Sequence, residues 1–334
     1  MSKGSNPATP TFFSSIFPVN FLYYCGMKKL LLLLLCVLCF VSCKKDLPVE
    51  DCPEDVLSLD PTIGNHNVLI VGIDGFRSDA LTENITPFMY GLSSRDDVYF
   101  TPFHKTEEDT YSGPNWSSIL TGVHYYKHNV VDNSFVGSRF STYPPFQYYL
   151  ELAYQEINTS SITNWTPINT YIYQQYLDYT SESTLNDSMV FQAASELLVD
   201  SFSAPDVLFL HFDELDAAGH SYGFSPQVSE YANTLSKIDI FVESLFNIIE
   251  EKRNDLGENW LFLIVSDHGG DGTGHGDAEN PHINQTIFFS QHPDLNFTPN
   301  YITNQTDLAP TILDYMGVAS EEIDCKMDGV SIIE

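Results

Sequence analysis

Basic residues are scarce in this sequence. Its 334 residues include 14 lysines and arginines against 45 aspartates and glutamates, so the formal net charge is −31 at pH 7. A surface of this sign repels the phosphate backbone of nucleic acids and anionic membrane surfaces. We therefore expect no nucleic-acid binding. We expect most of the acids to form a solvated surface and some of them to be candidates for metal ligands.

The sequence also lacks an apolar run long enough to cross a bilayer. Its longest run, residues 30–41, is shorter than the roughly 20 residues that a membrane-spanning helix needs. Two lysines precede this run, and a serine and Cys43 follow it, an order typical of a bacterial lipoprotein signal peptide. We expect residues 1–26 to be a spurious extension, residues 27–42 to be the signal peptide and Cys43 to be acylated.

This signal predicts where the protein resides. We expect it in the bacterial cell envelope, facing the periplasm or the outer surface, with the lipid anchor as its only contact to the membrane. The alternative is an uncleaved membrane anchor.

Cysteine is nearly absent from the rest of the chain. Of the six cysteines, only Cys52 and Cys325 follow Cys43. In an oxidising compartment these two residues could form a disulfide that ties the ends of the domain together. The sequence does not supply the distance between them, so the paired and the free state both remain open.

Short apolar runs that end in a polar residue recur along the chain. Residues 67–74, 206–213 and 260–267 have the composition of buried parallel strands. Residues 286–290 are a fourth candidate strand. The stretch 138–190 is rich in tyrosine, serine and threonine and is a candidate for a cap that faces the substrate.

Helical patterns alternate with these strands. Apolar residues that step by three and four predict a helix over 231–249, and a second helical pattern covers 307–317. Strands that alternate with helices indicate an α/β fold, with a mostly parallel central sheet and helices on both faces. We expect residues 43–65 to form a tether and residues 66–334 to form a single domain.

Carboxylates and histidines follow the predicted strand ends. Ligands bind at the carboxyl ends of parallel strands, so Asp74, Asp213 or Asp216, and Asp267 are expected to converge. His268 follows Asp267 directly, and His220 lies four residues after Asp216, on the same face if that segment is helical. Aspartate and histidine are both ligands of divalent metals. The alternative for each pair is an ordinary polar loop after a strand.

A third histidine lies in a glycine-rich loop. His275 is flanked by glycines and is the expected partner of Asp216 and His220 in holding one metal, with His282 as the alternative. A flexible turn without a ligand is the other interpretation. As a ligand, His275 would join the aspartates and histidines at the strand ends in a set that suits two metal ions.

Ser112 precedes the N-terminus of a predicted helix, because Pro114 suits a first helical turn and Gly122 suits a helix end. The N–H groups and the dipole at a helix N-terminus favour an anion. A serine hydroxyl becomes a nucleophile when metal coordination lowers its pKa. The alternative is that Ser112 only caps the helix.

The order of these motifs resembles the alkaline phosphatase superfamily, and most of all its type I phosphodiesterase/nucleotide pyrophosphatase branch. The motifs are Ile-Asp-Gly at 73–75, Ser-x-Pro-Asn at 112–115 with a following Thr-Gly, Asp-x-x-Gly-His at 216–220, Asp-His-Gly at 267–269 and His-Gly at 275–276. The resemblance implies an alkaline-phosphatase-like catalytic domain that cleaves a small-molecule phosphate ester with two divalent metal ions. Zinc is the expected metal, with manganese or iron as alternatives.

The resemblance also assigns roles to individual residues. It implies in-line attack by Ser112, a phosphoseryl intermediate, and hydrolysis of that intermediate by a water on the second metal. The implied ligands are Asp74, Ser112, Asp267 and His268 for the first zinc and Asp216, His220 and His275 for the second, and Asn133 matches an asparagine that holds a phosphate oxygen.

One residue departs from the pattern of that branch: threonine usually stands where this chain has Ser112, which leaves Thr110 as an alternative nucleophile. Trp116 stands where sulfatases of the same superfamily need arginine, which argues against a sulfatase. We expect a phosphodiesterase or nucleotide pyrophosphatase. The alternatives are a phosphomonoesterase or sulfatase-like hydrolase of the same superfamily and, from another class, a non-catalytic metal-binding surface lipoprotein.

Overall fold

The computed structural model describes residues 65–334, except 175, 182–184, 201–203 and 319–324. The predicted extension, signal peptide and acylated Cys43 lie outside these residues, as does nearly all of the predicted tether. Among the residues described, no helix combines the length and apolarity needed to cross a bilayer. The lipid anchor and the location in the cell envelope therefore stay predictions.

A seven-stranded mixed sheet organises the described residues, in the order β2-β7-β6-β1-β5-β3-β4. Strands β6, β1, β5, β3 and β4 run parallel, whereas β7 is antiparallel to both β6 and β2. The three strands predicted at 67–74, 206–213 and 260–267 are the three central ones. The strands are β1 (His66–Ile73), β2 (Val98–Lys105), β3 (Thr159–Thr163), β4 (Tyr179–Thr180), β5 (Val207–Phe212), β6 (Asn259–Val265) and β7 (Gln285–Gln291).

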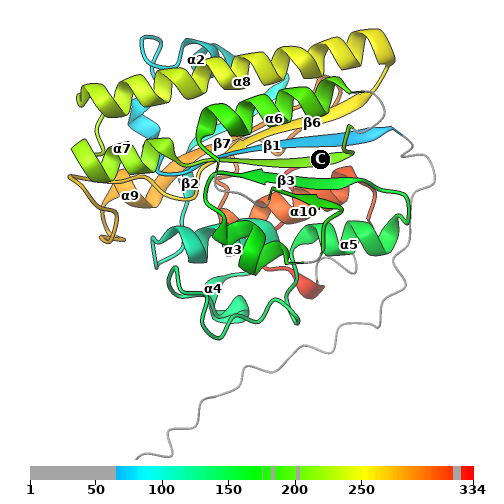
Figure 1. Cartoon of the computed structure of the whole chain (residues 1–334), viewed down its shortest axis with the longest axis horizontal. Coiled ribbons are helices and arrows are strands. Elements are labelled where there is room, and N and C mark those ends of the chain that lie inside the picture. Colours follow the sequence, from blue (N-terminus) through cyan, green and yellow to red (C-terminus); the bar gives the residue numbers. More distant parts are fainter. Residues whose placement is uncertain (1–64, 175, 182–184, 201–203, 319–324) are drawn as a thin grey trace, which may run out of the picture. The chain divides into compact units, whose positions relative to one another are not determined.

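Helices cover both faces of this sheet (Figure 1). On one face lie α2 (Pro87–Leu92), α6 (Asp187–Val199), α7 (Glu214–Tyr222) and α8 (Ser229–Leu256). On the other lie α3 (Ser112–Thr121), α5 (Phe146–Ala153) and α10 (Leu308–Tyr315), with the short α4 (Tyr125–His128) packed against α3. The shorter elements are α9 (Pro281–Asn284), the 3-10 turns η1 (Ser78–Ala80) and η3 (Gln305–Asp307), and the π-helical turn η2 (Ile168–Tyr173).

The alternation of side chains in β1 explains the two covered faces. Val68 and Ile70 belong to the apolar core beneath α3 and α10, whereas Leu69, Val71 and Ile73 belong to the core beneath α8. Successive side chains of a strand point to opposite faces, so a strand that is apolar throughout must be covered on both sides. The predicted fold class thus follows from the apolar runs themselves.

The register of the central strands aligns their carboxyl ends. Ile73 of β1 pairs with Phe212 of β5, and Gly72 pairs with Val265 of β6. Because these three strands are parallel, the residues that follow them emerge at one edge of the sheet. Asp74 and Asp267 therefore lie close together although almost two hundred residues separate them.

Cys325 is disulfide-bonded in this structure. Its predicted partner, Cys52, lies outside the described residues. The pairing of Cys52 with Cys325 therefore stays a prediction.

A buried histidine joins α4 to α3. The His128 ring is fully buried, and its Nδ1 accepts the Val130 N–H at 3.1 Å. The proton of the neutral ring is then on Nε2, which lies 2.9 Å from the Ser118 hydroxyl on α3. Burial, and then the charge of His124, lowers the pKa of His128 to about 3.

This histidine is expected to make stability depend on pH. Because the pKa of His128 is lower in the folded chain than the usual 6.5, the unfolded chain binds more protons between pH 6.5 and about 3. The free energy of unfolding should therefore fall by about 1.4 kcal/mol per pH unit on acidification through this window. His128→Gln should be less stable at pH 7 but should lose stability less steeply below pH 6.5.

Urea unfolding at pH 7, 5.5 and 4.5 would measure both proteins side by side. The difference between them isolates His128 from the other titrating groups. Parallel stability curves for the variant and the unsubstituted protein would contradict the prediction.

Candidate metal centre

The structure brings the predicted ligands together at the carboxyl end of the sheet. They come from the residue after β1, the start of α3, helix α7 and the single loop between β6 and α9. The residues are Asp74, Ser112, Asp216, His220, Asp267, His268 and His275.

One group consists of Asp216, His220 and His275, whose ligand atoms all lie within 4.8 Å of one another. Asp216 and His220 are four residues apart on α7, with Oδ2 and Nε2 separated by 3.3 Å. The Nε2 atoms of His220 and His275 face each other at 3.2 Å. The loop histidine that joins this group is therefore His275.

The protonation of these two rings favours a cation between them. Nδ1 of His220 lies 2.9 Å from the Thr273 carbonyl, and Nδ1 of His275 lies 2.7 Å from the Thr110 carbonyl. A carbonyl only accepts, so both Nδ1 atoms carry the proton and both Nε2 atoms present lone pairs. Two lone pairs pointed at each other repel, whereas a metal ion accepts both. This geometry fits a metal site.

The second group surrounds His268. Its Nδ1 lies 2.7 Å from the Gly269 carbonyl, which again leaves Nε2 as the lone pair. That Nε2 lies 3.4 Å from Asp74 Oδ1, 3.3 Å from Asp267 Oδ2 and 3.3 Å from the Ser112 hydroxyl. Four candidate ligands of three types, two carboxylates, an imidazole and a hydroxyl, thus lie close together, as a first metal would require.

Both groups of candidate ligands contain buried oxygens that have no hydrogen-bond partner. Among the described residues they include Asp74 Oδ1, Asp216 Oδ1 and Asp267 Oδ2. A buried carboxylate oxygen without a partner is costly unless a cation neutralises it. Asp74 Oδ1 and Asp267 Oδ2 face His268 Nε2, and Asp216 faces His220 Nε2 with its other oxygen, Oδ2. The donor set therefore fits two divalent ions, and carboxylate with imidazole suits zinc.

Burial perturbs the acidity of this cluster. It raises the pKa of Asp74 to about 8, with the charge of Asp267 as the next cause. It raises the pKa of Asp216 to about 7, helped by the charge of Asp74, and raises the pKa of Asp267 well above its usual value. Burial, and then His268, lowers the pKa of His275 to about 3. The cluster is built for the charge of bound cations rather than for free carboxylates in water.

Ser112 faces the metal ligands and does not cap α3. The N-cap of α3 is Tyr111, and no side chain caps that helix. The Ser112 side chain is almost fully buried with its hydroxyl beside His268. Thr110, the alternative nucleophile, instead donates its hydroxyl to the His275 carbonyl. The structure thus gives Thr110 the task of holding the His275 loop.

Asn133 follows α4 in the chain, and its side chain contacts the first turn of α3, next to Ser112. Its Oδ1 accepts the Gly113 N–H at 2.7 Å. A Cβ on Gly113 would lie 2.8 Å from the Asp132 carbonyl and 3.0 Å from Asn133 Oδ1, so glycine permits this close approach. With Oδ1 engaged, the NH₂ end of Asn133 is its hydrogen-bond donor. Its predicted contact with a phosphate oxygen stays a prediction.

His282 lies away from the Asp216 group. Its exposed ring is 3.7 Å from Asp79, and its backbone carbonyl accepts the Gly270 N–H at 2.9 Å. A Cβ on Gly269 would lie 2.0 Å from that carbonyl. His282 therefore shapes the Asp-His-Gly-Gly loop through its backbone.

Sequence reasoning missed two residues that contact Asp74. Trp116 Nε1 lies 2.9 Å from Asp74 Oδ2, and His211 Nε2 lies 3.1 Å from the same oxygen. Trp116 is one helical turn after Ser112, and His211 is a polar residue near the end of an apolar strand. These two sequence positions could have indicated that both side chains lie near the carboxyl edge of the sheet.

Only part of the predicted cap borders the site. Ile168, Ile172 and Tyr173 are fully buried core residues. The Trp165 ring, however, lies 6.5 Å from the His211 ring, and Tyr171 stacks on Phe135 at 4.9 Å. Four aromatic residues of this stretch, Phe140, Phe146, Tyr149 and Tyr173, are thus buried in the core, whereas Trp165 lies near the metal centre.

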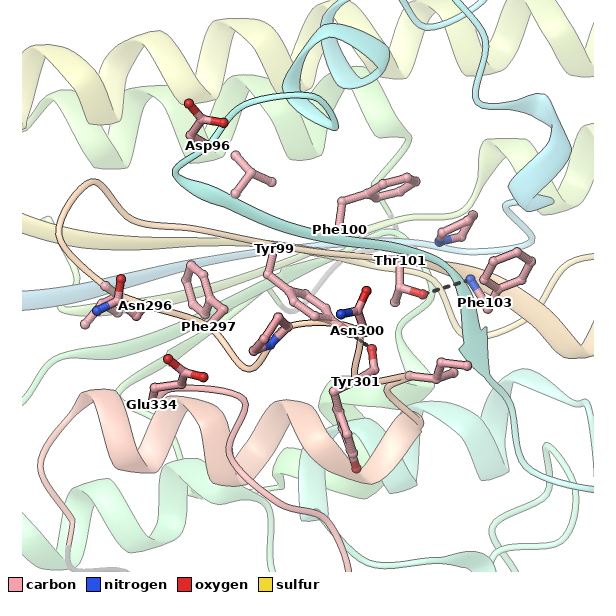
Figure 2. Close-up of a pocket in the computed structure, with 15 residues that line it drawn as sticks. Asp96, Tyr99, Phe100, Thr101, Phe103, Asn296, Phe297, Asn300, Tyr301 and Glu334 are labelled. Atoms are coloured by element: carbon pink, nitrogen blue, oxygen red, sulfur yellow. Dashed lines mark hydrogen bonds between the residues drawn. The ribbon is translucent and has the colours of Figure 1, made fainter.

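A cavity of about 600 Å³ lies along the edge strand β2 instead. Figure 2 shows aromatic side chains around it, including Tyr99, Phe103, Phe297 and Tyr301. None of the predicted metal ligands lines this cavity. We assign it no part in the chemistry.

Known proteins resemble this chain in sequence and in fold. The family model described as type I phosphodiesterase/nucleotide pyrophosphatase matches residues 68–291. Ectonucleotide pyrophosphatase/phosphodiesterase 2 of Saccharomyces cerevisiae is 23% identical over 303 residues, and the match covers 78% of this chain and 60% of that protein. Bis(5′-adenosyl)-triphosphatase ENPP4 of Pongo abelii is 28% identical over 226 residues, with coverage of 60% and 47%. The chain spans about half the length of these two curated relatives.

A solved structure supports the fold. Murine ectonucleotide pyrophosphatase/phosphodiesterase 5 in complex with AMP superposes with a TM-score of 0.59 at 15% sequence identity. The superposition covers 76% of this chain and 96% of that one. The predicted alkaline-phosphatase-like fold class is thereby confirmed.

Proposed function

We propose that this chain, which belongs to the type I phosphodiesterase/nucleotide pyrophosphatase family, is a metal-dependent phosphoric ester hydrolase that cleaves a small phosphodiester with Ser112 as nucleophile. The observation that carries the proposal is that the Ser112 hydroxyl lies 3.3 Å from His268 Nε2, the same lone pair that faces the unpartnered oxygens of Asp74 and Asp267. A binding site alone would not need a hydroxyl at that point.

Each group would hold one ion, and zinc suits both. Asp74, Asp267, His268 and the Ser112 oxygen would hold the first, and Asp216, His220 and His275 the second. Bound zinc would lower the pKa of the Ser112 hydroxyl and offset the charge of the phosphate.

The chain's own residues then position the ester. The phosphate sits at the N-terminus of α3, where the helix dipole favours an anion. The NH₂ group of Asn133, oriented by the Gly113 N–H, donates to a phosphate oxygen. Ser112 forms a bond to phosphorus as the alcohol leaves, and water then cleaves the phosphoseryl bond and restores the serine.

The charge of the site favours a diester over a monoester. A diester carries one negative charge and a monoester up to two, so a monoester needs more positive charge. Arg77 is engaged elsewhere, since it pairs with Asp79 and donates to the carbonyls of Phe224 and Gly270. Lys127 likewise pairs with Asp328.

Hydrolysis of two chromogenic esters tests the proposal. We expect the purified protein to cleave bis-p-nitrophenyl phosphate with zinc present, to cleave p-nitrophenyl phosphate more slowly, and to lose both activities after chelation. Turnover of the monoester alone would replace the diesterase with a phosphomonoesterase. No turnover of either ester by the zinc-loaded protein would contradict the proposal and favour a sulfatase-like or a binding role.

A further inference from the structure

The two oxygens of Asp74 have different surroundings. Oδ2 has two nitrogen neighbours, Trp116 Nε1 at 2.9 Å and His211 Nε2 at 3.1 Å. Oδ1 has no hydrogen-bond partner among the described residues and faces His268 Nε2 at 3.4 Å. One oxygen is thus fixed by the protein and the other is presented to the metal centre.

A carboxylate oxygen accepts, so His211 donates to it from Nε2 as Trp116 does from Nε1, and both donors are themselves held in place. Trp116 and His211 are fully buried, and their rings meet edge to face at 4.8 Å. Gly72 of β1 makes room for the indole, because a Cβ there would lie 2.6 Å from the Trp116 ring. An indole fitted into such a space cannot turn its N–H away from Asp74 without disturbing the packing of the core.

Asp74, His211 and Asp213 also place ligand atoms within 4.8 Å of one another, the pattern of a further cation site. Trp116 argues against that use. An indole N–H only donates, and it points at the Asp74 oxygen that faces His211. The group therefore serves as hydrogen-bond support for Asp74.

We infer that Trp116 and His211 are positioning residues that hold Asp74 as a one-oxygen ligand of the first metal. This inference rests on the metal site of the proposed function. A ligand whose second oxygen is fixed loses little freedom on metal binding, and hydrogen-bonded outer partners typically change metal affinity 10–100-fold. The pair thus sets how tightly the first zinc is held.

Zinc affinity of the Trp116→Phe variant tests the inference. Phenylalanine keeps an aromatic ring and removes the N–H. We expect zinc binding at the first site to weaken about 10–100-fold, measured on the full chain by competition with a chromogenic chelator. The zinc concentration for half-maximal diester turnover should rise by the same factor, and saturating zinc should restore turnover.

Trp260→Phe is the matched control. Trp260 is also fully buried and its Nε1 donates to Glu258 at 2.7 Å, but it lies near the start of β6, at the opposite end from Asp267. This variant should keep the zinc affinity of the unsubstituted protein. Equal affinity in Trp116→Phe and the unsubstituted protein, or an equal loss in both variants, would overturn the inference.

His211 supplies an independent pair of variants if Trp116→Phe fails to fold. His211→Gln retains an N–H donor, whereas His211→Leu removes it. Zinc affinity should fall further in the leucine variant than in the glutamine variant, and equal affinities would count against the inference. If the unsubstituted protein itself binds no zinc, the proposed metal site is wrong, and the positioning role of Trp116 and His211 is wrong with it.

Discussion

Replacing Ser112 by alanine is expected to lower diester turnover by about a thousandfold or more while leaving the protein folded and able to bind zinc. The Ser112 hydroxyl is beside His268, where three carboxylate and imidazole ligands remain after its removal. Removal of the nucleophile of a covalent mechanism eliminates the main route of reaction. Steady-state rates with bis-p-nitrophenyl phosphate and zinc titrations of both proteins measure the two effects.

Ser117→Ala is the matched control for this variant. Ser117 lies on the same helix, is fully buried, and donates its hydroxyl to the Gly113 carbonyl. Its loss should change turnover only slightly. If Ser112→Ala keeps its rate, or if Thr110→Ala loses more activity than Ser112→Ala, Ser112 is not the nucleophile.

The same comparison separates an enzyme from a metal-binding surface lipoprotein. A protein that only binds metal would show no turnover before the substitution and the same zinc affinity after it. The proposed enzyme loses its turnover and keeps its zinc.

Asp267→Asn is expected to remove the first zinc and, with it, diester turnover. The Asp267 side chain is fully buried, its Oδ1 accepts the Gly75 N–H, and its Oδ2 has no hydrogen-bond partner. Burial raises the pKa of this carboxyl well above its usual value, so without metal the neutral amide resembles the protonated acid. The variant should therefore fold without zinc and gain less stability when zinc is added.

Thermal unfolding with and without zinc measures this difference. A ligand at 1,000 times its dissociation constant stabilises a protein by about 4 kcal/mol. Zinc should stabilise the unsubstituted protein through two bound ions and the Asp267→Asn variant through only one. An Asp267→Asn variant with the same zinc-dependent shift and stoichiometry as the unsubstituted protein would remove Asp267 from the ligand set.

The central strands could be predicted because burial on both faces leaves an unmistakable pattern. β1, β5 and β6 are almost entirely apolar and are followed by aspartate or serine-aspartate. β3 gave no such signal, since its sequence Thr-Ser-Ser-Ile-Thr is polar although all five residues are buried. The Ser161 hydroxyl is satisfied by Asn169 within the fold, a contact that no local pattern reveals.

β2 escaped prediction for a different reason. It is an edge strand, with Pro102 at a register shift in its pairing with β7 and with polar residues among the apolar ones. Edge strands tolerate proline and exposed polar groups, so their composition resembles that of a loop.

Spacing and residue type were enough to predict which carboxylates and histidines lie together, but not the residues that contact them from outside the group. His275 rather than His282 joins Asp216 because the Thr110 carbonyl orients the His275 ring, and the path of that loop is a tertiary property. Trp116 and His211 read as ordinary core residues in the sequence. Their role depends on a space beside Gly72 that only the packed sheet defines.

Anomalous scattering at the zinc edge, recorded from crystals of the zinc-loaded protein, would locate the metals directly. We expect two peaks, one among Asp74, Asp267 and His268 beside Ser112, and one among Asp216, His220 and His275. A single peak, or zinc bound away from these residues, would contradict the two-metal site on which the proposed hydrolysis depends.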